Sequence, residues 1–399
     1  MLQAPVRMSI LFIALALSTS MPGHAQAVLT DTDFNQQIGS VDARFQSNVQ
    51  KTVEDLIVQH DIVGATVAIV VDGKLQAAVA AGKRKAGSPE PLLITDPMHT
   101  GSNTKGMTAL LFGRLVDKGK LSFTQKIRDS VPYRVSADFA DLPLFDFLTM
   151  RSGLSDKLTP DIFDNKYNPD LANRYRGPSK LYSDERQLFV KDSLKTKAGY
   201  PARSKTEYSS ASFLTIGAIE EIVMGGTAWE DLMQTEVFKP LHMKAAGFGV
   251  MGSGKDVLTP WQHAKKNGAW DPIYHDNPRY GGPAGSVHCS AIDLANYAFA
   301  RVVGAYGRGS FLSRRTWNTL QTPPEGGYAC GIAVSGPDAN GIRDMSHGGS
   351  NNLSCSDWWV RHHGRIIVTV MINCKSDDGL RAILDSLVKL TETISGITN

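Results

Sequence analysis

The segment Trp358-Trp-Val-Arg-His-His-Gly-Arg-Ile-Ile-Val-Thr-Val-Met-Ile372 decides the fold class, because it has the pattern of two strands joined by a tight turn. Aromatic and β-branched residues fill both arms, and such side chains favour extended backbone. His362-His-Gly364 supplies the turn between them. The segment therefore predicts an antiparallel hairpin close to the C-terminus.

A second pair of strands is predicted near the other end of the chain. Thr66–Val71 is apolar and β-branched, Asp72-Gly73 is a hairpin turn signal, and Leu75–Ala81 is the returning strand. A closing helix carries an apolar stripe formed by Leu380, Ile383, Leu384, Leu387 and Leu390.

Helical spacing dominates the segments between these strands. We expect helices at residues 31–60, 99–118, 212–223, 229–237 and 286–303. The most economical arrangement joins both ends of the chain in one sheet. We therefore predict an α+β fold, with an antiparallel sheet flanked by helices (about 28–100 and 285–399) and an inserted, mostly helical lobe (about 120–284).

The N-terminus has the pattern of a signal peptide spanning residues 1–27. Arg7 is followed by the apolar run Met8–Leu17, and Ala25-Gln-Ala27 is a cleavage site. A retained anchor is the alternative, although the apolar run is short for a membrane span. We expect a periplasmic or secreted protein that begins near Val28 and has no stable membrane span after processing. The formal net charge of +3 gives no electrostatic case for nucleic acid as a partner.

The chain has four cysteines, Cys289, Cys330, Cys355 and Cys374. Export permits disulfides, and four cysteines allow three pairings. Cys355 and Cys374 flank the C-terminal hairpin, so a cross-strand bridge and buried free thiols both remain open. The spacing matches no zinc signature, and no metal is expected.

Ser102-Asn-Thr-Lys105 is an S-x-x-K motif at a predicted helix start. Positions i and i+3 share one helix face, so the lysine amine can approach the serine hydroxyl and assist its deprotonation. A capping role for Ser102 is the structural alternative. A second match, Ser386-Leu-Val-Lys389, lies on the polar side of the closing helix and is interpreted as a solvated face.

Two further motifs add candidate residues. Tyr208 precedes an apolar helix, and a tyrosine beside a lysine can act as a base. His347-Gly-Gly349-Ser350 leads into a strand, and its glycines let a substrate approach the backbone closely.

The order of these motifs resembles the serine β-lactamase-like and penicillin-binding protein superfamily, which includes class C β-lactamases, DD-peptidases and family VIII esterases. Phe147–Leu154, Lys239–Met243 and Pro283–Leu294 also resemble phrases of that superfamily. The resemblance extends over nearly all of residues 28–399 and implies a two-lobed hydrolase without a cofactor.

The resemblance also implies roles for individual residues. Ser102 is the expected nucleophile, Lys105 and Tyr208 manage its proton, and the backbone N–H groups of Ser102 and Ser350 form an oxyanion hole. His347 occupies the position of a β-lactamase lysine, beside the carboxylate or leaving group of the substrate. Gly349 belongs to the same substrate-binding strand.

Two departures from the superfamily pattern shape the functional prediction. Ser210 stands where an asparagine normally contacts the amide side chain of the substrate. His347 replaces a lysine, and histidine is only partly charged near neutral pH. Both departures favour a carboxylesterase-type acyl hydrolase that takes small esters.

The alternatives are a DD-peptidase or D-aminopeptidase acting on D-amino-acid peptides, a β-lactamase, and, less favoured, a non-catalytic penicillin-binding sensor. His60, His242 and His288 are interpreted as surface or satisfied core residues. The pair His362-His363 is expected to be exposed in its turn, and Asp293 to be structural.

Overall fold

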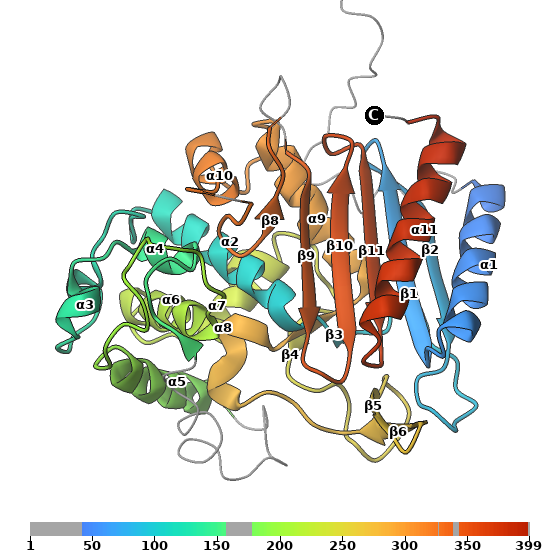
Figure 1. Ribbon diagram of the computed structural model, residues 1–399, viewed down its shortest axis with the longest axis horizontal. Helices are drawn as coiled ribbons and strands as arrows, with labels where there is room; N and C mark the ends of the chain where they lie inside the picture. The colour runs from blue at the N-terminus through green and yellow to red at the C-terminus, as the bar shows by residue number, and fades with distance from the viewer. Residues whose placement is uncertain (1–41, 157–177, 326, 338–342, 398–399) are drawn as a thin grey trace, which may run out of the picture.

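The computed structural model describes residues 42–156, 178–325, 327–337 and 343–397, so the predicted signal peptide lies outside the described residues. Its central feature is a six-stranded antiparallel sheet with the strand order β2-β1-β11-β10-β9-β8 (Figure 1). The strands are β1 Gly64–Val71, β2 Lys74–Gly82, β8 Ala333–Val334, β9 Met345–Ser350, β10 Cys355–Arg361 and β11 Ile366–Ile372. The two ends of the chain therefore share one sheet, as the sequence predicts.

Burial along the strands follows from their position in the sheet. Every residue of β11 is buried, because helices cover both faces of the sheet at its centre. Strand β2 alternates between buried and partly exposed residues, as expected of an edge strand that packs one face against the core.

Two apolar cores lie on opposite faces of the sheet. The helices α1 (Ala43–Gln59) and α11 (Asp377–Ser395) pack side by side on one face, and the core beneath them includes Val49 and Leu384. The other face carries α9 (Ala291–Ala305) and the larger core, which continues into the helical lobe around α2 (Thr104–Asp117).

The helical lobe lies to the left of the sheet in Figure 1. The remaining helices are α3 Ala137–Ala140, α4 Leu144–Leu148, α5 Ser179–Ser193, α6 Ser210–Val223, α7 Trp229–Met233, α8 Gly282–Gly285 and α10 Arg314–Gln321. A single π-helical turn, Gln234–Phe238, extends α7. The fold is the predicted α+β architecture.

Two small sheets in the described residues were not predicted. They consist of β3 Met98–His99, β4 Gly247–Phe248 and β7 Val287–Cys289, and of the hairpin β5 Gln262–Lys266 with β6 Ala269–Ile273. These strands are two to five residues long and lack sustained apolar alternation, so no sequence pattern indicates them.

Three local predictions are wrong for identifiable reasons. The helix expected from His99 begins only with the 3₁₀ turn at Gly101, because His99 pairs with His288 as part of β3. The helix expected from Ser286 begins only at Ala291, because a capping box between Ser290 and Asp293 starts it and Val287–Cys289 pairs as β7. His362 is only 7% exposed, because its ring contacts Glu392 of α11 at 2.6 Å.

The four cysteines are buried and unbridged, which resolves the two alternatives left open by the sequence. Burial raises the pKa of the Cys374 thiol to about 12, and the pKa of the Cys355 thiol to about 11. These thiols therefore remain protonated at neutral pH, and the Cys355 thiol contacts Ser350 Oγ at 3.6 Å and Asp377 Oδ1 at 3.4 Å.

Candidate active site

The turn that presents Ser102 is a single 3₁₀ turn, Gly101–Asn103, which leads directly into α2. Gly101 has a φ of +53°, and a Cβ atom built on it would lie 2.3 Å from the Ser350 nitrogen. Only glycine fits at this position, in both conformation and space. Ser102 is thereby held against β9 with its side chain partly exposed.

Lys105 lies one helical turn beyond Ser102. Its Nζ donates to Ser102 Oγ at 3.1 Å and to the carbonyl oxygen of Ala284 at 2.6 Å. The side chain is only 1% exposed, so its amine is shielded from solvent and fixed beside the hydroxyl. This is the geometry that the i, i+3 spacing predicts.

Tyr208 reaches Ser102 from the segment that leads into α6. Its hydroxyl donates to Ser102 Oγ at 2.5 Å, and Lys105 Nζ lies 4.7 Å from the centre of its ring. Tyr208 is 48% exposed, so its hydroxyl can reach both the nucleophile and a bound substrate. The Ser102 hydroxyl thus contacts two groups that can exchange a proton with it.

Strand β9 forms the opposite wall of the site. A Cβ atom built on Gly349 would lie 2.0 Å from the Thr100 oxygen and 2.8 Å from the Ser102 nitrogen. The absent side chain allows the backbone of β9 to approach the nucleophile turn. This approach places the backbone at Ser350 next to that turn, where the predicted oxyanion hole requires it.

His347 lies in β9 with its side chain away from solvent. It is 8% exposed, and its Nε2 lies 3.3 Å from the hydroxyl of Tyr328. Burial, with the nearby cations Lys105 and Arg301, lowers the pKa of His347 to about 3. The expectation that His347 is partly charged near neutral pH is therefore wrong, because burial disfavours the charged imidazolium and the two nearby cations repel it.

We expect the imidazole of His347 to stay neutral between about pH 5 and pH 8. Histidine-selective NMR is the measurement, with the His347 resonances assigned by their loss in His347→Gln. Chemical shifts that remain at neutral-ring values across this range are the expected result. A titration with a midpoint near 6.5, the ordinary value for histidine, would contradict the burial argument.

Ser210, the predicted substrate-binding residue two positions after Tyr208, begins α6. Its backbone N–H donates to the Asp156 carboxylate at 2.8 Å, and Ala211 donates to the same group at 2.8 Å. This carboxylate caps the first turn of α6, because it accepts N–H groups that have no partner inside the helix. Ser210 is not among the residues that line the cleft at Ser102.

A buried histidine and aspartate beneath the nucleophile turn were missed by the sequence analysis. His99 Nε2 lies 2.9 Å from Asp276 Oδ1, and both side chains are fully buried. His99 Nδ1 accepts the Gly101 N–H at 3.0 Å, so the ring proton faces Asp276. The position of His99, three residues before Ser102, was the one sequence feature that could have indicated a role at the site. No sequence pattern marks Asp276.

We expect His99→Leu to lower kcat by about 10- to 100-fold with little change in KM, because it removes the acceptor that holds the Gly101 N–H. His99→Asn, whose amide oxygen can take the place of Nδ1, is expected to recover most of the loss. Steady-state kinetics on one ester measures both. Equal losses of kcat in the two variants would exclude a positioning role for this hydrogen bond.

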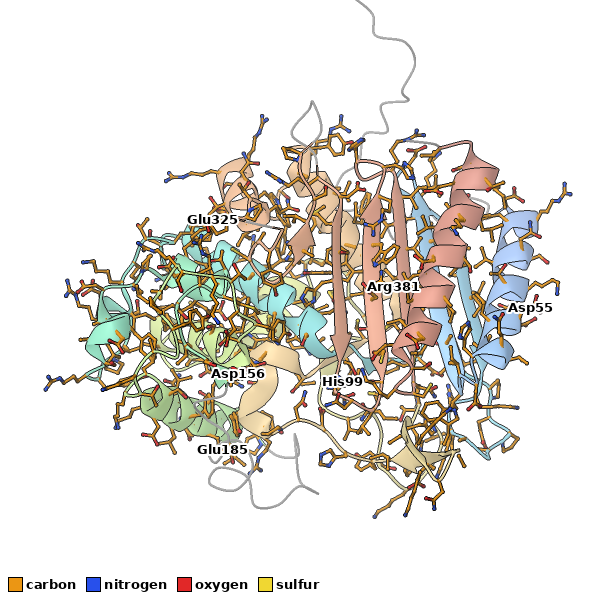
Figure 2. All side chains as sticks on the ribbon, in the orientation of Figure 1. Asp55, His99, Asp156, Glu185, Glu325 and Arg381 are labelled. Atoms are coloured by element: carbon orange, nitrogen blue, oxygen red, sulfur yellow. The ribbon has the colours of Figure 1, made fainter. Side chains whose placement is uncertain are left out.

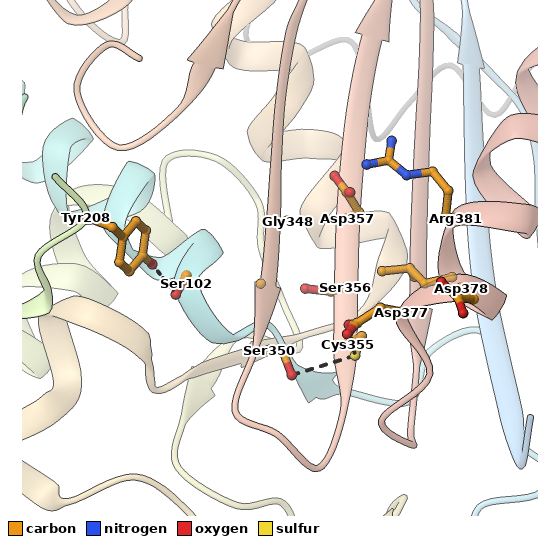
Figure 3. Close-up of a pocket in the computed structure, with 12 residues that line it drawn as sticks. Ser102, Tyr208, Gly348, Ser350, Cys355, Ser356, Asp357, Asp377, Asp378 and Arg381 are labelled. Carbon is orange, nitrogen blue, oxygen red and sulfur yellow. Dashed lines mark hydrogen bonds between the residues drawn. The ribbon is translucent and has the colours of Figure 1, made fainter. Parts of the chain in front are cut away.

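Ser102 opens into a cleft of about 470 Å³ that crosses the end of β9 and reaches the first turn of α11 (Figure 3). The lining residues are Ser102, Tyr208, Gly348, Gly349, Ser350, Cys355, Ser356, Asp357, Asp377, Asp378, Leu380 and Arg381. Over the described residues, no group of three or more His, Cys, Asp or Glu side chains is arranged to hold a metal ion.

A two-lobed α+β fold with a Ser-Lys-Tyr cluster at a helix start defines the class of β-lactamase-type serine hydrolases. The family model described as Beta-lactamase matches residues 45–392, and the chain belongs to this family. The resemblance inferred from the motifs is therefore confirmed.

Individual relatives are distant. Penicillin-binding protein 4 of Amycolatopsis lactamdurans is 25% identical over 258 residues, which are 62% of this chain and 62% of that protein. An N-acetylmuramyl-L-alanine amidase of Bacillus subtilis is 27% identical over 241 residues, 54% of this chain and 50% of the amidase. The chain thus matches less than two thirds of the length of these curated relatives.

Solved structures share the fold at low identity. The D-amino acid amidase of Ochrobactrum anthropi SV3 has a TM-score of 0.69 at 16% identity, over 88% of this chain and 100% of that chain. EstCE1, a hydrolase with promiscuous acyltransferase activity, has a TM-score of 0.67 at 16% identity, over 86% of this chain and 98% of that chain. At this identity the likeness concerns the fold alone.

Proposed function

We propose that this protein is a secreted acyl hydrolase of the carboxylesterase type that works through an acyl-enzyme on Ser102. The observation that carries the proposal is the convergence of Lys105 Nζ and the Tyr208 hydroxyl on Ser102 Oγ, at 3.1 and 2.5 Å. A serine hydroxyl is a poor nucleophile unless a neighbouring group takes its proton.

The proposed reaction has two steps. Ser102 Oγ attacks the ester carbonyl carbon while its proton passes to the Lys105–Tyr208 pair, and the N–H groups of Ser102 and Ser350 stabilise the oxyanion. The alcohol leaves with that proton, and the acyl group remains on Oγ. A water molecule then attacks the acyl carbon, its proton returns Ser102 to the hydroxyl form, and the acid departs.

An ester is favoured over an anionic substrate because His347 does not supply a fixed charge. Its pKa of about 3 makes it neutral at physiological pH. A β-lactam or a peptide with a free C-terminus carries a carboxylate that needs a cation nearby. Ser210, whose backbone is held by Asp156, also offers no asparagine amide to an acylamino side chain.

Export is part of the proposal and rests on the pattern of residues 1–27. In the part of the chain that the structure describes, no helix combines the length and apolarity needed to cross a membrane. Expression of the full chain with its N-terminal segment, followed by mass spectrometry of the exported product, tests this part. A mature N-terminus near Val28 would support it.

The activity is tested by assaying p-nitrophenyl butyrate and a chromogenic cephalosporin side by side. A larger kcat/KM for the ester supports the proposal, and a larger value for the cephalosporin would put a β-lactamase in its place. If neither substrate turns over, mass spectrometry after incubation with a penicillin separates the remaining candidates. A stable adduct on Ser102 would indicate a non-catalytic sensor or a slow peptidase.

The second candidate is an amidase or peptidase for D-amino-acid substrates. The fold likeness to a D-amino acid amidase supports testing it. D-Amino-acid p-nitroanilides, compared with their L-enantiomers, are the appropriate substrates. Faster turnover of the D-anilides than of p-nitrophenyl butyrate would replace the esterase proposal by this candidate.

A further inference from the structure

The cleft continues from Ser102 to the opposite face of the main sheet. Gly349 faces the nucleophile turn, so the alternation of a strand directs its neighbour Gly348 to the other face. Gly348 pairs with Asp357 across the β9–β10 ladder. Strand β8 pairs only with Ser346 and Met345, so within the described residues the end of β9 near Gly348 is an edge over which a substrate can pass.

Asp357 is the buried end of this extension. The residue is 8% exposed, and its carboxyl group accepts hydrogen bonds from the backbone of Trp358 and the side chain of Trp359. These leave one oxygen, Oδ1, without a hydrogen-bond partner among the described residues. A buried carboxylate oxygen without a partner is costly, which points to a group that is absent here. Its other oxygen lies 3.3 Å from the Cβ position of Gly348, so the missing side chain at Gly348 exposes the carboxylate to the cleft.

The charged groups around Asp357 favour a positive ligand. The cleft is lined by three carboxylates, Asp357, Asp377 and Asp378, and by one cation, Arg381 (Figure 3). The Arg381 guanidinium lies 4.7 Å from the centre of the Trp359 ring, and Arg361 lies over the same ring at 4.2 Å. Lys375 pairs with Asp377 at 2.7 Å, which leaves Asp357 and Asp378 as the lining carboxylates without a lysine partner in the described part of the chain. These two carboxylates outnumber the lining Arg381, so an anionic substituent is repelled and a cationic one attracted.

We propose that this extension, bounded by Gly348, Asp357 and the first turn of α11, is a subsite for a cationic amino or quaternary ammonium group of the substrate. The inference rests on the proposed ester hydrolysis and names its substrate class: esters with a positively charged substituent a few bonds from the scissile carbonyl.

Ionisation of Asp357 sets the assay conditions. Burial raises the pKa of this carboxyl to about 6. The positive charges of Arg381 and Arg361, and hydrogen bonds from Trp358 and Trp359, lower the pKa by a smaller amount. The group is therefore largely charged at pH 8, where the experiments are performed.

The first experiment compares esters that differ only in charge. Choline butyrate and its carbon isostere 3,3-dimethylbutyl butyrate place the charge in the alcohol. The p-nitrophenyl esters of 4-(trimethylammonio)butyrate and of its carbon isostere place it in the acyl group. In at least one pair we expect kcat/KM to be about tenfold higher for the cationic ester than for its neutral isostere. An effect of this size is typical of one charge–charge interaction near a protein surface.

Asp357→Asn is expected to bring that ratio close to one, since it removes the charge and keeps the shape. Asp55→Asn is the matched control, because Asp55 lies on α1, outside the cleft, and pairs with Lys51 on the surface (Figure 2). Ratios near one in both wild-type pairs, or a cation preference that survives in Asp357→Asn, would overturn the inference.

A binding measurement tests the subsite without catalysis, and a second variant tests it if Asp357→Asn does not fold. Calorimetric titration of choline and of 3,3-dimethylbutanol into the wild type and Asp357→Asn measures the subsite directly. If no ester is hydrolysed, the proposed function fails, and equal binding of the two alcohols would overturn the subsite as well. If Asp357→Asn does not fold, Gly348→Val, whose side chain would cover the carboxylate, should abolish the preference.

Discussion

Ser102→Ala is expected to lower kcat for p-nitrophenyl butyrate by about 10⁶-fold, the size of effect seen when the nucleophile of a serine hydrolase is removed. The physical reason is that Ser102 Oγ is the atom contacted by both Lys105 Nζ and the Tyr208 hydroxyl. Without it, the bound ester has no acceptor for its acyl group. A fluorophosphonate probe with detection by intact-protein mass spectrometry gives a second readout, with one label on the wild type and none on the variant.

The matched control is Ser386→Ala, which removes the serine of the second S-x-x-K motif. Ser386 lies on α11, and Lys389 of the same motif is exposed. We expect wild-type rates and wild-type labelling. If Ser102→Ala retained more than about a tenth of the activity, the acyl-enzyme on Ser102 would have to be abandoned.

Lys105→Met is expected to lower kcat by about 1,000-fold, within the range found when a general base is lost. Methionine keeps an unbranched side chain of similar size but cannot take the proton of Ser102. The variant also leaves the buried Ala284 oxygen without its donor, which costs about 1–3 kcal/mol of stability. Stopped-flow kinetics with p-nitrophenyl butyrate should show that acylation itself has become slow.

The folded state and the coupling to Ser102 are checked separately for this variant. Thermal denaturation establishes that Lys105→Met is folded at the assay temperature. The double variant with Ser102→Ala should be no less active than Ser102→Ala alone, because residues that act as one unit lose their effects non-additively. A loss below about tenfold in Lys105→Met would transfer the role of base to Tyr208.

The charges of the site and of the cleft support the proposed preference for neutral or cationic esters. His347 is buried and neutral, and the extension of the cleft is lined mainly by carboxylates. Both features act against substrates with a carboxylate and in favour of neutral or cationic esters.

The sequence by itself determined the main sheet and the nucleophile motif, because both depend on local patterns. Residues 66–71 and 366–372 are β-branched runs whose strand character needs no distant partner to be recognised, and they pair as β1 and β11. The Ser102–Lys105 contact likewise follows from the period of one helix. The family resemblance supplied Tyr208, although 106 residues separate it from Ser102.

Tertiary structure alone decided the environment of these groups. The charge of His347 depends on burial and on Lys105 and Arg301, and the Asp276 carboxylate meets His99 from a distant loop. The prediction that His362 is exposed was wrong because its ring contacts Glu392, which belongs to a separate helix, α11. Desolvation and long-range packing set ionisation and accessibility, and a linear sequence does not record which distant side chains provide them.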